Sequence, residues 1–200
     1  METITREYTV YSYSELSEEA KEKVREWYID DIERCYSLSD CWNEYLTYEF
    51  RRSDLKVQWS LNYCQGDGVN VYGKLMLSDM MNKIDFEPYT TKEFRFIEWV
   101  IKEFNPEITL LQNDHYGYCM ADRIDLESDL LWEMEYNGIK NIKRDVLEKL
   151  NNDIMAYFEN LCSQWETSGY EYLYEPDEEE IIEACEANEW KFTEEGKLFY

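Results

Sequence analysis

The segment 55–77 constrains the fold more than any other part of the chain. Apolar and polar residues alternate along 55–63 and again along 69–77, and Cys64-Gln65-Gly66-Asp67-Gly68 stands between the two runs. A period of two places the apolar side chains of a strand on one face, and Asp-Gly is a strong signal for a tight turn. The segment therefore predicts an antiparallel hairpin with one buried face. Gly73, inside the second run, indicates a bulge or a close approach of another backbone.

Apolar residues at spacings of three and four predict helices on both sides of this hairpin. Ser17 is expected to cap the first helix, because Glu18 and Glu19 follow it at the positive end of the helix dipole. Pro176 is expected to begin the last one, since proline is tolerated in a first turn. The predicted helices span 17–34, 41–51, 78–86, about 90–104, 139–165 and 176–188.

Further short strands and turns complete the predicted set of elements. The expected strands are 4–12, then 108–111 and 118–121 as a second hairpin, one strand within 124–136, and 170–174. A tight turn at 194–197 is expected to join 190–192 to 198–200. Helices interspersed with hairpins favour the α+β class with an antiparallel sheet packed against several helices. Without repeats or a flexible linker, we expect one compact domain over 1–200, with the acidic part 139–200 packed on it.

The charge of the chain limits the partners that it can bind. The chain has 45 Asp and Glu against 20 Lys and Arg, a formal net charge of −25, and residues 101–200 carry 25 of the acids but only 8 of the bases. Nucleic acid and anionic membranes require Lys and Arg, so neither is expected as a direct ligand. A basic protein is the natural counterpart of such a surface.

The sequence predicts no membrane segment, metal site or cofactor. No apolar run approaches the roughly 20 residues that span a bilayer, and the N-terminus lacks the pattern of a signal peptide, so we expect a cytoplasmic protein. The six Cys are scattered and form no CxxC pair, and in a reducing compartment they are expected to be small core residues or inert thiols. Cys64, Cys119 and His115 could meet at two hairpins, but a zinc site needs four well-placed ligands.

Catalytic residues are not predicted either. Asp114 and His115 are an acid–base pair by type, but adjacent residues in a turn point apart and no nucleophile shares the turn. Gln65-Gly66-Asp67-Gly68 lacks the lysine of a phosphate loop and the alternate acids of a calcium loop. A paired-carboxylate hydrolase remains an alternative, although 45 acids make chance pairs common.

The acidic C-terminal part is the candidate binding region. In one interpretation its glutamates are only the solvated face of an amphipathic helix. In the other they form an anionic surface that resembles the charge of a nucleic-acid backbone. The predicted partner-binding residues are Tyr170, Glu171, Tyr172, Tyr174, Glu175, Asp177, Glu178, Glu179, Glu180, Glu183 and Glu186.

Three stretches of the chain resemble a group of acidic proteins encoded by bacteriophages and prophages, some with an antitoxin-like label. They are Tyr13-Ser14-Glu15-Leu16-Ser17-Glu18-Glu19-Ala20-Lys21, Ser60-Leu61-Asn62-Tyr63-Cys64-Gln65-Gly66-Asp67-Gly68-Val69, and the tail from Ile182 to Lys197. The matched stretches cover about a third of the chain and carry no catalytic motif. The resemblance implies a bacterial host cytoplasm and a counter-defence setting that includes anti-CRISPR proteins.

These observations lead to three functional hypotheses. The first is an acidic, anti-CRISPR-like inhibitor that binds a basic nucleic-acid-binding protein or CRISPR-type effector, by mimicking nucleic acid. The second is an antitoxin-like protein that neutralises a toxin through a patch rich in Tyr and Trp, and the third is a small hydrolase. Only the first predicts an affinity that falls steeply with salt. The sequence leaves the oligomeric state open.

Overall fold

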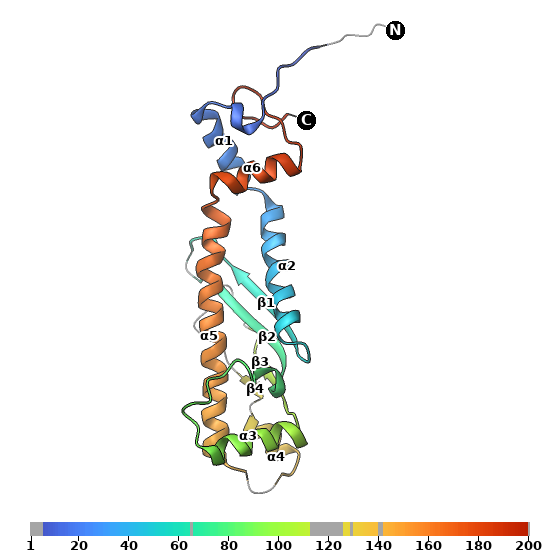
Figure 1. The fold of residues 1–200 in the computed structure, drawn as a ribbon, viewed down its shortest axis with the longest axis vertical. Coiled ribbons are helices and arrows are strands. Elements are labelled where there is room, and N and C mark those ends of the chain that lie inside the picture. The colour runs from blue at the N-terminus through green and yellow to red at the C-terminus, as the bar shows by residue number, and fades with distance from the viewer. Residues whose placement is uncertain (1–5, 65, 113–125, 129, 140–141, 200) are drawn as a thin grey trace, which may run out of the picture. The chain divides into compact units, whose positions relative to one another are not determined.

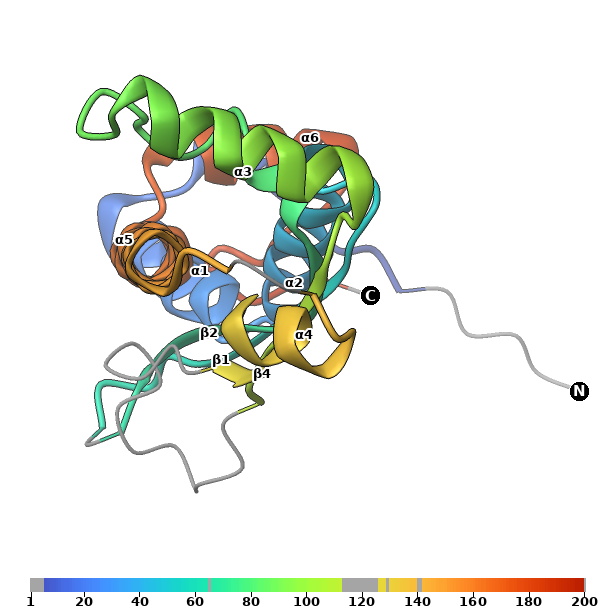
Figure 2. The ribbon, with the colours of Figure 1, turned by 90° about the horizontal axis from the view of Figure 1, so that it is seen from below.

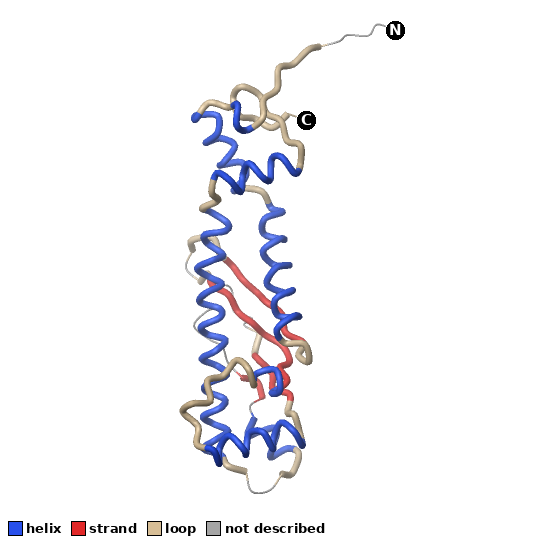
Figure 3. The backbone as a smooth tube through the Cα atoms, viewed as in Figure 1, coloured by secondary structure: helices blue, strands red, loops and turns tan. Residues whose placement is uncertain are grey.

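The protein has an α+β fold, as the sequence predicts. The computed structural model describes residues 6–64, 66–112, 126–128, 130–139 and 142–199. Helices and a four-stranded antiparallel sheet make up the described chain (Figures 1 and 3). The helices are α1 (Glu18–Ile29), α2 (Ile32–Glu49), α3 (Thr91–Glu103), α4 (Leu130–Tyr136), α5 (Arg144–Tyr174) and α6 (Glu178–Ala187). None of these described helices is both long enough and apolar enough to cross a membrane.

The contacts within the chain cluster into two compact units. The terminal unit comprises residues 1–37 and 170–200, and the central unit comprises residues 38–169. The division falls inside α2 and α5, so each of these helices contributes to both units.

The sheet belongs to the central unit and confirms the predicted hairpin. The strands are β1 (Asp54–Ser60), β2 (Gly68–Met76), β3 (Glu107–Leu110) and β4 (Leu126–Ser128), in that order. Val57 pairs with Val71 in the antiparallel register of β1 and β2. Gly73 has a φ of +116°, and a Cβ there would lie 2.3 Å from the carbonyl oxygen of Asp54. The expected close backbone approach is therefore present.

The core of the central unit includes a group of aromatic rings between helices and sheet. Figure 2 shows α2, α3 and α5 on one side of β1 and β2. The Trp42 ring of α2 stacks on Trp165 of α5, with centroids 5.2 Å apart and 5° between the planes, and meets Trp59 of β1 edge-on. The Trp59 indole N–H donates a hydrogen bond of 2.9 Å to the Ser39 hydroxyl, so its polar atom is satisfied.

The terminal unit has its own core of buried side chains. It is built by α1, by α6, by a 3-10 helix at Tyr13–Glu15 and by the C-terminal tail. The tail turn forms as predicted, because Phe192 bridges both Tyr11 and Leu198 in antiparallel fashion. The buried members of this core are Tyr13, Leu16, Ala20, Val24, Tyr28, Ile181, Cys185 and Phe192.

The largest error of the sequence interpretation lies at the end of α5. Residues 170–174 are helical rather than a strand, because α5 continues through Ser168 and Gly169 to Tyr174. Gly169 is buried, and a Cβ at this position would lie 2.5 Å from the Leu61 side chain and 2.9 Å from the Trp42 ring. The glycine therefore serves close packing and not helix termination.

Other boundaries differ from the predicted ones. The predicted strand 4–12 is wrong over its described residues except for the single bridge at Tyr11. The predicted helix 17–34 is interrupted, since α1 ends at Ile29 and α2 begins at Ile32, well before the expected residue 41.

Segment 78–86 contains only a 3-10 helix, Leu77–Met80. Segment 124–136 holds the short β4 and then α4. Residues 113–125, which include the predicted strand 118–121, lie outside the described residues.

The caps of two helices lie where the sequence places helix starts, whereas Pro176 does not begin the last helix: it precedes Asp177, which caps α6. Ser17 caps α1, and its hydroxyl accepts a hydrogen bond from the Ala20 amide. Thr90 caps α3 in a reciprocal arrangement with Glu93, which accepts from the Thr90 amide. Capping depends only on residues within one turn, so the sequence contains the whole signal.

Candidate functional site

Negative charge is concentrated in the terminal unit. Residues 1–37 and 170–200 carry 21 acidic against 7 basic residues, whereas the much longer central unit carries 24 against 13. The net charge per residue of the terminal unit is therefore more than twice that of the central unit. All eleven predicted partner-binding residues belong to the terminal unit.

Helix α6 presents three carboxylates along one exposed face. Asp177 caps the helix, and its carboxylate accepts a hydrogen bond of 2.8 Å from the Glu180 amide. Glu179, Glu183 and Glu186 are exposed and follow one another at spacings of four and three residues, which places them on one face. We call these three residues the acidic stripe. None of them forms an ion pair with any other described residue.

Glu178 stands apart from the acidic stripe because it has a partner. The Lys21 ammonium donates to Glu178 at 2.9 Å and lies 3.3 Å from Glu18. The hydrogen bond to Glu178, followed by that to Glu18, raises the pKa of Lys21. Glu178 therefore ties α6 to α1 and is only in part available to an external cation.

Glu180 is also engaged within the protein. The Arg34 guanidinium donates to Glu180 at 2.7 Å and also to the backbone carbonyl of Tyr172. The rings of Tyr28 and Tyr172 lie 4.2 and 4.7 Å from the centre of the guanidinium. Burial raises the pKa of Tyr28 to about 12. Arg34 and its neighbours form a structural cluster, which the sequence reading missed because its members are distant along the chain.

The predicted tyrosines occupy the last turns of α5. Tyr172 faces Arg34, while the Tyr170 and Tyr174 rings approach each other with centroids 6.2 Å apart. Glu171 and Glu175 are exposed beside them. Of the eleven predicted residues, the structure therefore assigns internal contacts to some and leaves the acidic stripe, Glu171 and Glu175 exposed. Their role in binding stays a prediction.

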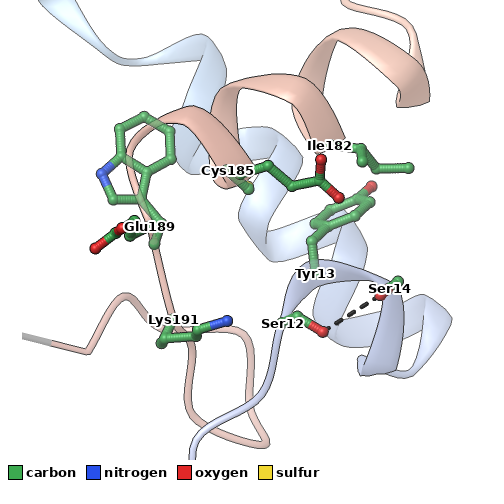
Figure 4. A pocket seen from close by; sticks show the side chains of 9 residues that line it. Ser12, Tyr13, Ser14, Ile182, Cys185, Glu189 and Lys191 are labelled. Atoms are coloured by element: carbon green, nitrogen blue, oxygen red, sulfur yellow. Dashed lines mark hydrogen bonds between the residues drawn. The ribbon is translucent and has the colours of Figure 1, made fainter.

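A pocket of about 460 Å³ opens between the 3-10 helix and the end of α6 (Figure 4). Sequence reasoning did not predict this pocket. Its lining comes from two segments that are almost 170 residues apart along the chain. The lining residues are Ser12, Tyr13, Ser14, Ile182, Cys185, Glu186, Glu189, Trp190 and Lys191.

No metal centre is formed by the residues that the structure describes. Asp67 accepts hydrogen bonds from the Asn62 and Cys64 amides and from the Ser60 hydroxyl, so it organises the hairpin turn. The Cys64 thiol donates to Asp67, and this hydrogen bond raises its pKa. A raised pKa disfavours the reactive thiolate. Asp114, His115 and Cys119 lie outside the described residues.

Comparisons with known proteins give this chain no relative. No protein-family model, curated protein or solved structure matches it. The resemblance of three stretches to acidic phage proteins stays a prediction.

Proposed function

We propose that this protein binds a basic, nucleic-acid-handling protein of a bacterial host through the terminal unit and inhibits it. In this view it is an anti-CRISPR-like counter-defence factor that occupies a cationic groove in place of nucleic acid. The observation that carries the proposal is the acidic stripe. Glu179, Glu183 and Glu186 share one exposed face, and no described cation neutralises them.

The charge at the end of α6 is unfavourable for the helix itself. The carbonyl end of a helix favours cations, and a basic side chain there contributes about 0.3–1 kcal/mol. The last turn of α6 carries no basic residue and instead contains Glu186. Such a residue lowers the stability of its own helix. The last turns of α1, α2, α4 and α5 also lack a basic residue, so this feature reflects the acidity of the chain and does not single out α6.

The charge spacing indicates how such mimicry would work. A helix rises 1.5 Å per residue, so the acidic stripe places three charges over about 10 Å. One strand of B-DNA places a phosphate every 3.4 Å or so. The stripe alone is therefore sparser than a strand, and the binding surface must include further carboxylates of the terminal unit such as Glu171 and Glu175.

The test begins with the purified protein as bait in a bacterial lysate, eluted with steps of NaCl. The captured basic protein is then purified, and its affinity is measured at 50 and 200 mM NaCl. We expect the affinity to fall by about tenfold or more, because exposed charge pairs are screened over this range. Inhibition is read from the nucleic-acid binding of the captured protein.

Two variants of equal charge locate the surface. One carries Glu171→Gln, Glu179→Gln, Glu183→Gln and Glu186→Gln. The control changes four exposed glutamates of the central unit to glutamine: Glu44, Glu98, Glu148 and Glu159. We expect at least tenfold weaker binding by the first variant and less than about twofold by the control. Equal losses would show that net charge alone acts, and this would overturn the assigned surface.

A second candidate function rests on exposed aromatic side chains of the central unit. Trp132 and Tyr136 of α4 are 53% and 76% exposed, and their rings stack with centroids 5.0 Å apart. Exposed Trp and Tyr are typical anchors of protein interfaces, which favours the antitoxin-like alternative. Trp132→Ser with Tyr136→Ser should then abolish capture of a partner that resists 500 mM NaCl, and unchanged capture would exclude this alternative.

A further inference from the structure

We propose that the pocket at the end of α6 holds an arginine side chain of the basic partner. This inference rests on the proposed function and adds a specific anchor to it. The pocket volume of about 460 Å³ falls within the 300–1,000 Å³ typical of ligand sites. It is ample for one long side chain.

The charge at the pocket selects a cation. Glu186 and Glu189 both line the pocket and are exposed, and neither forms an ion pair within the described residues. Lys191 is the single lining residue with positive charge. The two carboxylates of the lining outnumber this one cation. An anionic ligand would meet two carboxylates and is disfavoured.

Aromatic walls favour arginine among the cations. Trp190 and Tyr13 line the pocket, and the Trp190 ring is fixed edge-on against Trp27 at 4.9 Å. The Tyr13 residue is only 3% exposed and the Lys21 ammonium lies 5.6 Å from its ring centroid, so the half-buried Trp190 is the more accessible aromatic wall. A planar guanidinium stacks on aromatic faces and donates to a carboxylate through two N–H groups, which a lysine ammonium does less well.

The backbone at the pocket carries a cost that a binding role would explain. Helix α6 ends in a Schellman motif, in which the Trp190 amide donates to Cys185 and the Glu189 amide donates to Glu186. Glu189 has a φ of +54° at the position where glycine is usual. A glutamate in the left-handed region is strained, yet it places a carboxylate next to Trp190.

The experiment is a titration of the full, ¹⁵N-labelled chain with N-acetylarginine methylamide, followed by amide chemical shifts. We expect a dissociation constant on the order of 1 mM, with shifts gathered at Ser12, Tyr13 and Ser14 and at residues 186–191. N-acetyllysine methylamide should bind several-fold more weakly, because it lacks the planar fork. Shifts spread evenly over exposed carboxylates of both units would overturn the proposal.

Matched variants separate the pocket from general acidity. Glu186→Gln with Glu189→Gln should weaken binding of the arginine amide by about fivefold or more. The control pair, Glu194→Gln with Glu195→Gln, removes the same charge from the same unit outside the pocket. It should change the affinity for the arginine amide by less than about twofold. Glu189→Gly removes one carboxylate and relieves the backbone strain, so weaker binding by this variant cannot come from unfolding. Equal effects of the paired variants would refute the pocket.

Failure of this inference and failure of the proposed function give different results. If the arginine amide causes no shifts at the pocket but the chain still captures a basic protein in a salt-dependent manner, the pocket proposal is wrong and the function stands. If the amide binds in the pocket but no cationic protein is captured, the proposed function is wrong. The arginine site itself would then be confirmed.

Discussion

The guanidinium of Arg34 donates a hydrogen bond of 2.7 Å to the carboxylate of Glu180 while its side chain is only 4% exposed. The rings of Tyr28 and Tyr172 lie within 5 Å of the guanidinium, so aromatic faces take the place of water around the charge. This relationship joins the start of α2 to the end of α5 and to α6, all within the terminal unit. Glu180 therefore stabilises the fold, whereas its neighbour Glu179 belongs to the exposed acidic stripe.

Arg34→Met should destabilise the protein by about 3 kcal/mol, because it leaves Glu180 without its cation and removes two ring contacts. The value lies at the lower end for broken buried pairs, since the Glu180 side chain is 35% exposed and water can reach it. Urea unfolding followed by tryptophan fluorescence measures the change. Arg51→Met is the control: Arg51 is exposed over the Tyr48 ring, and its loss should cost less than about 1 kcal/mol. Similar losses in both variants would contradict the buried-pair interpretation.

Gly73→Ala should cost about 3 kcal/mol, because the new methyl group would meet the Asp54 carbonyl in a conformation with a φ of +116°. Gly138 also has a positive φ, +69°, but a Cβ there would have no neighbour within 4 Å. Gly138→Ala isolates the cost of backbone conformation and should reach only about 1 kcal/mol. The difference between the two unfolding free energies measures the close approach of β1 and β2, and no difference would contradict it.

Alkaline pH should destabilise the central unit through Cys162. Burial raises the pKa of this thiol to about 12, whereas an unfolded cysteine titrates near 8.5 or so. Below the unfolded pKa both states keep the proton. Between the two values only the unfolded state loses it, so stability falls as pH rises, by about 2 kcal/mol at pH 10. Unfolding free energies at pH 8 and pH 10 test this. Cys162→Ala should reduce the difference, and Cys41→Ala, at an exposed position, should leave it unchanged.

The accuracy of the sequence interpretation follows the range of the interactions concerned. Hairpin 54–76 was predictable because alternation and the Asp67-Gly68 turn are local signals. The end of α5 was not predictable, because Gly169 packs against Leu61 and Trp42, which are more than 100 residues away along the chain. From the neighbouring sequence alone, such a glycine is interpreted as the end of a helix.

The residues of the candidate site show the same difference between local and long-range signals. The exposed face of α6 could be read from the spacing of its glutamates, and its cap at Asp177 is a local feature. Arg34 could not be assigned, because its partners Tyr172 and Glu180 are 138 and 146 residues away. Tertiary structure therefore separates two adjacent glutamates, 179 and 180, that look equivalent in the sequence.

Charge reversal at the two ends of α6 should separate stability from binding. Glu186→Lys places a cation in the last turn, where it complements the helix dipole and faces Glu183 one turn away, so the unfolding free energy should rise by about 1 kcal/mol. Glu179→Lys makes the same charge change in the first turn and should lower it by about 0.5 kcal/mol. Both variants should weaken binding of the captured basic protein by about tenfold, because each reverses one charge of the acidic stripe. Urea unfolding and titration with that protein provide the two measurements. A Glu186→Lys variant that gained stability and bound its partner unchanged would show that the stripe serves only solubility.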